Sequence, residues 1–357
     1  MIRWRDGTVT DVVRRRPGAT EVRVATADGP VDALAYPDLV GEPQVGDRVL
    51  LNTTAIALGL GTGGFAMVIA VPDRLPADRD EPGHVVKARY TPMQATVLAV
   101  DEQDSPHHAT LRDADSVAGM PVVVADLHSA LPAVLAGLRD GGRDPRVVYV
   151  MTDGGALPLG FSRSVGELRA AGWLAATVTV GQAFGGDVEA VTLHSGLLAA
   201  RHVLGADLVI VTQGPGNLGT GTRWGFSGVA SGEAVNATAA LGGRPVAALR
   251  VSEADPRDRH RGVSHHSLTA LGRVALAPAD VAVPALGGEF GAAVADAVAA
   301  LSPPHRLVTV DVTGLRAAVA GAPVRASSMG RGLDEDEAYF VSCAAAGRHA
   351  ATLLQPA

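Results

Sequence analysis

The sequence is short of cysteine, lysine and aromatic residues. Of its 357 residues, one is a cysteine (Cys343) and one is a lysine (Lys87), and aromatic residues make up 4%. A single cysteine excludes an internal disulfide and any cysteine-built zinc or iron–sulfur site, and it fits a reducing compartment. The small and apolar neighbours of Cys343 predict a buried, inert thiol. With so few aromatics, we expect a core of valine, alanine and leucine.

Basic residues are also fewer than acidic ones, and the formal net charge is −7 at pH 7. This balance disfavours bulk attraction to nucleic acid or to an anionic membrane. Charges at positions 3, 5 and 6 interrupt the apolar run that a signal peptide needs, so we expect a cytoplasmic protein with no membrane partner. Residues 50–72 carry no charge and could span a bilayer by length, but their central glycines predict two β-rich arms around a turn.

The length predicts about two domains. Short β-like runs separated by turn signals fill residues 1–72, which predicts a small all-β barrel or sandwich. Residues 73–86 begin with a polar stretch rich in proline, aspartate and arginine, and we interpret them as a linker. The second domain is then expected to cover residues 87–357.

From Pro121 onward, nearly continuous apolar strands alternate with helical patterns. This alternation predicts an α/β fold, with a mostly parallel, doubly wound sheet covered by helices on both faces. The expected strands are residues 122–125, 147–150, 176–180, 208–211, 246–249 and 307–310. The expected helices are residues 129–139, 164–171, 188–204, 228–241, 290–301 and 334–353.

Ligands of such folds bind outside the carboxyl ends of the strands, so the residues after each strand are the first candidates. Asp126 and His128 follow the first expected strand, and Asp153 follows the second. Carboxylate and imidazole groups suit a divalent metal or acid–base catalysis. The alternative interpretation is structural, with Asp126 capping a helix and Asp153 holding a glycine turn.

A glycine-rich loop, residues 213–223, follows the fourth expected strand. Its glycines allow backbone N–H groups to turn toward an anion. The candidate anion-binding residues here are Gly214, Gly216, Asn217, Gly219, Thr220, Gly221, Thr222 and Arg223. A proline inside the motif and the missing acidic residue about 20 positions later disfavour NAD(P), and no Gly-Lys-Ser/Thr of a P-loop follows. The alternative is a tight structural loop.

Two further groups of polar residues are candidates. Lys87 and Arg89 could bind an anion, because a lone lysine in an arginine-rich sequence suggests a need for a compact ammonium group. Residues 255–267 form the densest polar run and contain three histidines, of which His265 and His266 are candidate catalytic residues. A solvated surface loop is the alternative for that run.

Several of these motifs together resemble one known family. They are Lys87-x-Arg89-Tyr90-Thr91-Pro92, Leu127-His128-Ser129, Met151 to Pro158, Gln213 to Asn217 and Ser264 to Ser267. The chain is similar, over nearly its whole length, to an uncharacterised family of actinobacteria and Firmicutes, domain of unknown function 3866. The resemblance implies a bacterial cytoplasmic protein and a shared scaffold, and it implies no activity.

The leading hypothesis is an enzyme that binds a small anionic or phosphorylated metabolite and catalyses hydrolysis or group transfer, with a divalent metal as one option. A non-catalytic nucleotide sensor or RNA-associated regulator is the alternative. RNA binding would show a steep dependence on salt. A purely structural scaffold ranks third, and a homodimer is the default expectation for the assembly.

Overall fold

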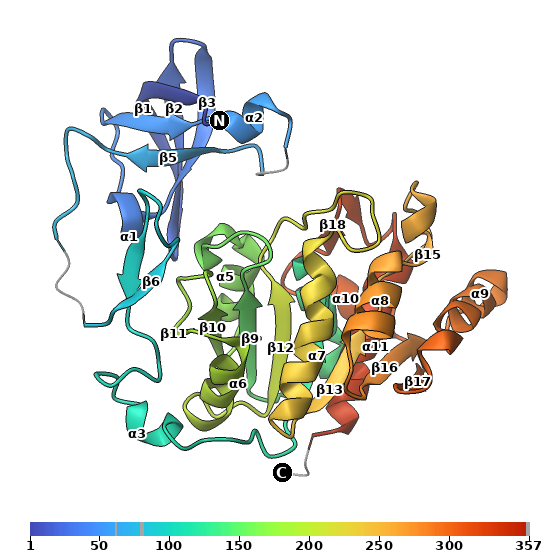
Figure 1. Ribbon diagram of the computed structural model, residues 1–357. Coiled ribbons are helices and arrows are strands. Elements are labelled where there is room, and N and C mark those ends of the chain that lie inside the picture. The colour runs from blue at the N-terminus through green and yellow to red at the C-terminus, as the bar shows by residue number, and fades with distance from the viewer. Residues whose placement is uncertain (61–62, 79–81, 355–357) are drawn as a thin grey trace.

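The computed structural model describes residues 1–60, 63–78 and 82–354, and begins with a closed barrel of five strands (Figure 1). The strands are β1 (Trp4–Arg16), β2 (Ala19–Thr26), β3 (Gly29–Ala35), β4 (Arg48–Asn52) and β5 (Ala66–Ala70), in the order β1-β2-β3-β5-β4. Two short helices, α1 (Pro37–Val40) and α2 (Thr54–Ala57), lie between strands. The predicted N-terminal all-β unit is therefore confirmed.

Alternation along the strands explains how the barrel closes. In β2, Val22 and Val24 are fully buried, whereas Arg23 between them faces solvent and pairs with Asp32 on β3 at 2.9 Å. Successive side chains of a strand point to opposite faces, so one face fills the barrel and the other carries charge. Residues 61–62 of the predicted glycine turn and residues 79–81 of the predicted linker lie outside the described residues.

The second unit is built on a parallel sheet of eight strands. They are β8 (Pro121–Val124), β9 (Val147–Thr152), β10 (Ala176–Val180), β11 (Val188–Ala190), β12 (Leu208–Gln213), β13 (Arg244–Ala248), β16 (Asp280–Pro284) and β17 (Arg306–Val310). Their order is β11-β10-β9-β12-β8-β13-β16-β17, and every neighbouring pair is parallel. The predicted doubly wound α/β fold is confirmed.

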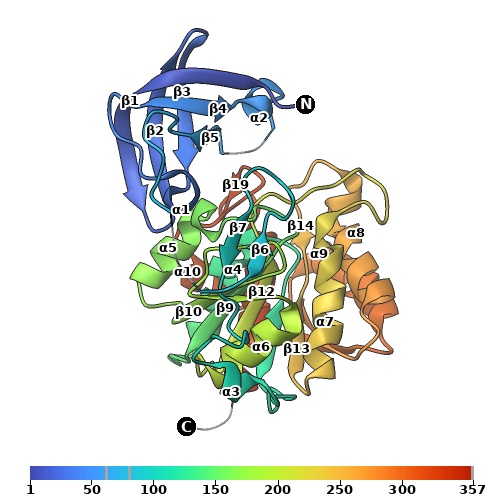
Figure 2. The ribbon, with the colours of Figure 1, turned by 60° about the vertical axis from the view of Figure 1, so that its left-hand side comes forward.

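Helices cover both faces of the sheet (Figures 1 and 2). One face carries α4 (Leu131–Arg139), α5 (Arg163–Ala170), α10 (Leu315–Ala320) and α11 (Glu337–Thr352). The other carries α6 (Leu193–His202), α7 (Ala230–Ala240), α8 (His265–Thr269) and α9 (Gly288–Val298), with α3 (His108–Leu111) against α6. Cys343 on α11 is buried, as expected.

Short elements complete the unit. The two-stranded pieces are β6 (Val85–Lys87) with β7 (Ala95–Val97), β14 (Val251–Ser252) with β15 (Gly262–Val263), and β18 (Ser327–Ser328) with β19 (Arg331–Gly332). The 3₁₀ turns are η1 (His128–Ala130), η2 (Leu159–Phe161), η3 (Ser227–Val229), η4 (Asp258–His260) and η6 (Ala299–Leu301), and η5 (Ala270–Val274) is a π-helical turn. No helix among the described residues is long and apolar enough to cross a membrane.

The helix predicted for residues 188–204 is wrong in its first part. Residues 188–190 form β11, an edge strand paired with β10, and the helix begins at Leu193. Thr192 caps that helix, because its side chain accepts a hydrogen bond from the backbone N–H of Ser195. Strand β16 had not been predicted, because its five residues start with aspartate and end with proline.

The barrel lies on the side of the sheet where the strands have their carboxyl ends (Figures 1 and 2). Arg16 of β1 donates hydrogen bonds to the carbonyls of Gly160 and Phe161, which belong to the connection after β9. Glu21 of β2 pairs with Arg163 at 2.9 Å. The barrel is thus attached beside the edge at which a ligand would bind.

Candidate functional site

The chain order of the strands places a topological switch point between β8 and β13, and we call the region outside the carboxyl ends there the crevice. The connection after β8 runs through α4 on one face toward β9, whereas the connection after β13 runs through α8 on the opposite face toward β16. At such a switch point the loops diverge and leave room for a ligand outside the carboxyl ends. Asp126 follows β8 and Arg250 follows β13, so the crevice has charged residues on both sides.

Asp126, Arg250 and His266 meet in this crevice, and all three are buried. The Arg250 Nη1 lies 3.8 Å from Asp126 Oδ2 and 3.3 Å from His266 Nδ1, and His266 Nδ1 lies 3.5 Å from Asp126 Oδ2. Asp126 Oδ2 has no hydrogen-bond partner, although it is inaccessible to solvent. A buried carboxylate oxygen without a donor is costly, so it marks a place where the protein holds a polar atom ready for another partner.

A network of carboxylates and arginines supports Arg250 from the other side. Arg250 Nη2 lies 3.8 Å from Asp255 Oδ2, and Asp255 also pairs with Arg257 at 2.8 Å and with Arg331 at 3.2 Å. The hydrogen bond from Arg257 holds the pKa of Asp255 well below its usual range. Arg331 of β19 pairs with Asp336 at 3.1 Å. The β18–β19 hairpin is therefore fastened to the crevice through charged hydrogen bonds.

Three histidines gather beside the Asp126–Arg250 pair: His260, His265 and His266, which we call the imidazole cluster. One ligand nitrogen from each ring lies within 4.8 Å of the others, and the ring centroids are 4.5 to 5.0 Å apart. Local sequence explains the gathering, because His260 ends η4, a short turn at β15 reverses the chain, and Ser264 caps α8. The Ser264 Oγ accepts from the backbone N–H of His266 and lies 2.7 Å from Nδ1 of His260.

The glycine loop reaches the imidazole cluster through Phe226. The ring of Phe226 stacks on His266 with centroids 3.8 Å apart and an interplanar angle of 6°. Phe226 closes the loop, since its backbone bridges to Gly219. At the outer end, the Nη2 of Arg259 lies 3.9 Å from where a Cβ on Gly221 would stand. The loop after β12 and the loop after β13 therefore form one surface.

In the loops after β9 and β12, two positions require glycine because the backbones of the two loops pack closely. A Cβ on Gly214 would lie 2.2 Å from the carbonyl oxygen of Ala156, and one on Gly155 would lie 2.2 Å from the carbonyl oxygen of Gly214. Both positions exclude any side chain. Gly216 and Gly221 have φ values of 96° and 80°, which favour glycine for conformational reasons.

The polar side chains of the glycine loop bind mostly within the loop. Thr220 and Thr222 are 3.0 Å apart at their hydroxyls and both contact Gly225. Asn217 accepts hydrogen bonds from Gln213 and Ser227, at 3.0 Å each. Gly219 and Arg223 are exposed. Thr220 and Thr222 are exposed too, so Arg223 is the charged one of three candidate anion-binding side chains of this loop that face solvent.

His128, predicted as a catalytic and metal-binding residue, lies outside the crevice. Its Nδ1 lies 2.9 Å from Tyr149 Oη and its Nε2 lies 2.7 Å from Ser162 Oγ, so both ring nitrogens are engaged. Burial lowers the pKa of His128 to about 4. Asp126, His128 and Asp153 do not form a group with metal-ligand spacing in the described part of the chain, whereas the three imidazoles of the cluster lie close enough together to hold a metal ion.

Asp153, Lys87 and Arg89 also lie elsewhere. Asp153 accepts a hydrogen bond from the backbone N–H of Gln182 at 2.8 Å, in the loop after β10. Lys87 is 1% exposed, and its Nζ contacts Glu189 at 3.2 Å and the carbonyl of Gly181 at 2.9 Å. Such an enclosed ammonium cannot reach a ligand. Arg89 is exposed on the loop after β6, and its backbone N–H binds Gln182.

Sequence reasoning did not assign a role to Arg250 or Phe226. Arg250 is the first charged residue after the apolar strand β13, and the same position had drawn attention to Asp126 after β8. Phe226 is an aromatic residue that ends a glycine-rich loop at the start of a helix. Both signals are visible in the sequence, but the stacking partner of Phe226 is 40 residues away and only the fold reveals it.

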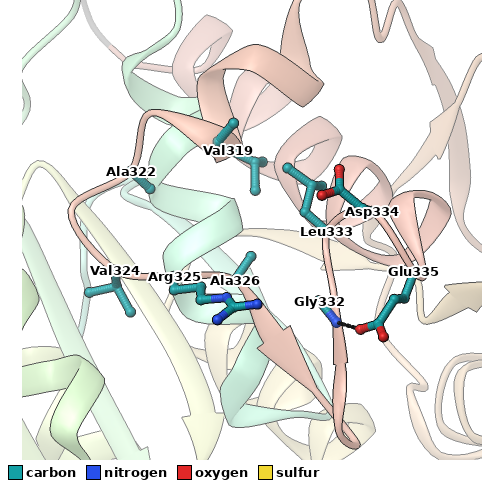
Figure 3. A pocket seen from close by; sticks show the side chains of 10 residues that line it. Val319, Ala322, Val324, Arg325, Ala326, Gly332, Leu333, Asp334 and Glu335 are labelled. Carbon is teal, nitrogen blue, oxygen red and sulfur yellow. Dashed lines mark hydrogen bonds between the residues drawn. The ribbon is translucent and has the colours of Figure 1, made fainter.

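Two cavities border this region. A small one of about 10 Å³ lies between Asp126, Gln213 and the start of α7, and Oε1 of Gln213 is another buried atom with no hydrogen-bond partner. A larger one of about 530 Å³ lies between α10 and the β18–β19 hairpin (Figure 3). Its polar lining is Arg325, Asp334 and Glu335, and Glu335 accepts a hydrogen bond from the backbone of Gly332. The larger cavity contains no residue of the imidazole cluster, so we do not place the chemistry there.

The family model described as protein of unknown function (DUF3866) matches residues 32–347. The chain belongs to this family. The match covers the whole parallel sheet, the glycine loop and the imidazole cluster, and it begins inside β3 of the barrel. No curated protein and no solved structure matches the chain.

Proposed function

We propose that this DUF3866 protein is an enzyme that acts on a small anionic, phosphorylated metabolite by hydrolysis or group transfer. The reaction site is the crevice outside β8, β12 and β13. The observation that carries this proposal is the stacking of Phe226 on His266, because it joins the anion-binding loop to the imidazole cluster. Groups for binding and groups for chemistry are thereby adjacent.

The residues divide the work as follows. Backbone N–H groups of the glycine loop, with Arg223 and Arg259 at its exposed end, bind the anion, since fixed dipoles and guanidinium groups suit phosphate oxygens. Arg250 is held in place by Asp126 and Asp255 and adds positive potential at the base of the crevice. Burial lowers the pKa of His260 to about 3, so this imidazole is neutral and has a lone pair available for a proton or a metal.

The test is phosphate release from a panel of phosphate monoesters and nucleoside diphosphates by the purified protein. We expect Arg259→Gln to raise KM and His265→Gln to lower kcat by about 100-fold or more, in line with the loss of a group that acts on the reacting atoms. The control is His194→Gln, because His194 is an exposed histidine of α6 outside the crevice. If all three variants turned over the substrate equally, the reaction would not take place in the crevice.

The nucleotide-sensing or RNA-associated alternative is less well supported. Five-stranded barrels do bind oligonucleotides, but five arginines of this barrel pair with carboxylates. Pairs of this kind are Arg5–Asp28, Arg15–Glu42, Arg16–Glu21, Arg23–Asp32 and Arg48–Asp73. Tight nucleotide binding without turnover would favour the sensor, and RNA affinity that falls steeply with salt would favour the RNA-associated regulator.

A further inference from the structure

The imidazole cluster contains a buried nitrogen atom, His265 Nε2, that the protein itself leaves without a hydrogen bond. Among the described residues, four buried side-chain atoms lack a hydrogen bond: Asp126 Oδ2, Arg139 Nε, Gln213 Oε1 and His265 Nε2. Two of the four, on Asp126 and His265, belong to the cluster or touch it. Buried polar atoms are nearly always satisfied in native proteins, so a pair of exceptions at one place points to a missing partner.

The hydrogen bonds around the cluster orient the rings for a shared ligand. His260 Nδ1 lies at hydrogen-bond distance from Ser264 Oγ, whereas His266 Nδ1 accepts a hydrogen bond from Arg250 Nη1 at 3.3 Å and lies 3.5 Å from Asp126 Oδ2. Nε2 of each ring therefore remains for another partner. This is the outer-shell pattern of metal-binding histidines, in which the second ring nitrogen faces a carboxylate or hydroxyl that fixes the tautomer.

We propose that His260, His265 and His266 bind one divalent transition metal ion of the zinc class through Nε2 of each ring, with Asp126 as a second-shell positioning residue. A metal on His266 Nε2 leaves the ring proton on Nδ1, which then donates to Oδ2 of Asp126 instead of accepting from Arg250. The same ion gives His265 Nε2 its partner. One ion thus satisfies both of these buried atoms.

The ligand set selects the class of metal. Three imidazoles suit zinc, cobalt, nickel or copper, whereas magnesium and calcium prefer oxygen ligands. Three protein ligands leave one position of a tetrahedral ion open, which is the arrangement of catalytic rather than structural zinc. Tetrahedral zinc brings its nitrogens to roughly 3.4 Å from one another, so the rings move inward when the ion binds.

The arginines near the imidazole cluster repel a bound metal ion less strongly than their number suggests. Arg257 and Arg331 are both paired with Asp255, and Arg250 lies between Asp126 and Asp255 at 3.8 Å from each. The carboxylates therefore offset these charges within the same network. The residual positive potential would also attract an anionic substrate to the open position of the metal, a role that rests on the proposed function, whereas metal binding itself does not.

The test is titration of chelator-treated full-length protein with Co²⁺, followed by displacement with Zn²⁺. We expect one Co²⁺ per chain with the intense visible absorption of a four-coordinate ion, and loss of that spectrum when Zn²⁺ replaces it. His265→Gln should abolish the spectrum, and Asp126→Asn should weaken affinity by about 10–100-fold while retaining one ion per chain. His194→Gln is the matched control and should bind as the unmodified chain does.

Several results would overturn the metal site. They are an absorption spectrum typical of six-coordinate Co²⁺, no saturable binding, or binding that His265→Gln leaves unchanged. Because the unmodified chain alone gives the spectrum, a variant that fails to fold does not decide the question. Metal binding without turnover of any phosphorylated compound would leave the metal site standing and remove the proposed function. Turnover that His265→Gln abolishes, by a protein that binds no Co²⁺, would do the reverse.

Discussion

The two halves of the sheet's carboxyl edge carry similar residues but use them differently. Around β6, β11 and η1, the ionisable groups bind other side chains: His128 binds Tyr149 and Ser162, and Lys87 binds Glu189. In the loops after β8, β12 and β13, Asp126 and His265 keep unpartnered buried atoms. Residue type alone does not separate the halves, whereas the supply of hydrogen-bond partners does.

This difference indicates that buried polar groups with all their hydrogen bonds stabilise the fold, whereas buried polar groups that lack a hydrogen bond mark the candidate site. A buried polar group that already has its hydrogen-bond partners gains nothing from a ligand. A buried polar group without a partner destabilises the protein, and a ligand that binds it removes that penalty. The comparison predicts that changes in the first half act on stability, whereas changes in the second half act on binding.

The largest stability effect is expected at Lys87. Its ammonium is enclosed with Glu189, and removal of one partner from a buried pair leaves the other charge uncompensated. We expect Lys87→Met to lower the free energy of unfolding by about 3–5 kcal/mol, measured by urea denaturation. Co²⁺ binding by the folded fraction should be unchanged.

A double variant sharpens this prediction. Lys87→Met with Glu189→Gln removes both charges and should recover most of the lost stability. If Lys87→Met instead left stability unchanged and abolished affinity for phosphate esters, Lys87 would be a ligand-binding residue. The proposed difference between the two halves of the edge would then be wrong.

The glycine loop gives a second, smaller contrast within one segment. Gly214→Ala places a methyl group against the carbonyl of Ala156 and should destabilise the protein by about 2–3 kcal/mol. At Gly219 the nearest atoms to a new Cβ are 4.0 Å away, so Gly219→Ala should change the free energy of unfolding by less than about 0.5 kcal/mol. Thermal and urea unfolding of both variants would test the pair, and equal destabilisation would contradict the packing role of Gly214.

The pH dependence of stability tests the burial of His128. Burial lowers the pKa of His128 to about 4 in the folded state, below its ordinary value of 6.5. Between pH 6.5 and 4 the unfolded chain binds a proton that the folded chain does not, so stability is full above pH 6.5 and falls as the pH drops to about 4. The loss is at most about 3 kcal/mol.

Replacement of His128 isolates this contribution. His128→Gln should be less stable than the unmodified chain at pH 7, and it should lose less of its stability between pH 6.5 and 4. Urea midpoints at several pH values measure both quantities. Parallel pH profiles for the two proteins would show that His128 is not the residue whose burial resists protonation.

Much of the fold could be predicted because its signals are local. The six expected strands of the sheet are apolar runs with many β-branched residues, and such runs can be buried on both faces of a sheet. Strand β11 could not be recognised in the same way, because its three residues owe their conformation to pairing with β10. An edge strand of this length carries too little pattern to compete with a following helix.

The candidate site was only partly predictable, because the sequence shows which groups are polar but not which of them are satisfied. Asp126, His265 and His266 were expected at the carboxyl edge, and the structure places them in one crevice. His128 looked equivalent to them until Tyr149 and Ser162 were seen on its two nitrogens. Those partners are 21 and 34 residues away in the sequence, and no local sequence pattern predicts the contacts.

The smallest effect is expected where the barrel meets the α/β unit. Glu21 is 4% exposed and contacts Arg16 at 3.3 Å and Arg163 at 2.9 Å. Glu21→Gln retains the shape of the side chain but removes the charge, so we expect a loss of about 1 kcal/mol, because Arg163 is half exposed and water replaces part of the interaction. The matched control is Asp28→Asn, which breaks the exposed pair with Arg5 on the barrel and should cost less than about 0.5 kcal/mol. If limited proteolysis after Pro72 released the barrel equally from both variants, Glu21 would not be the contact that holds the barrel beside the crevice.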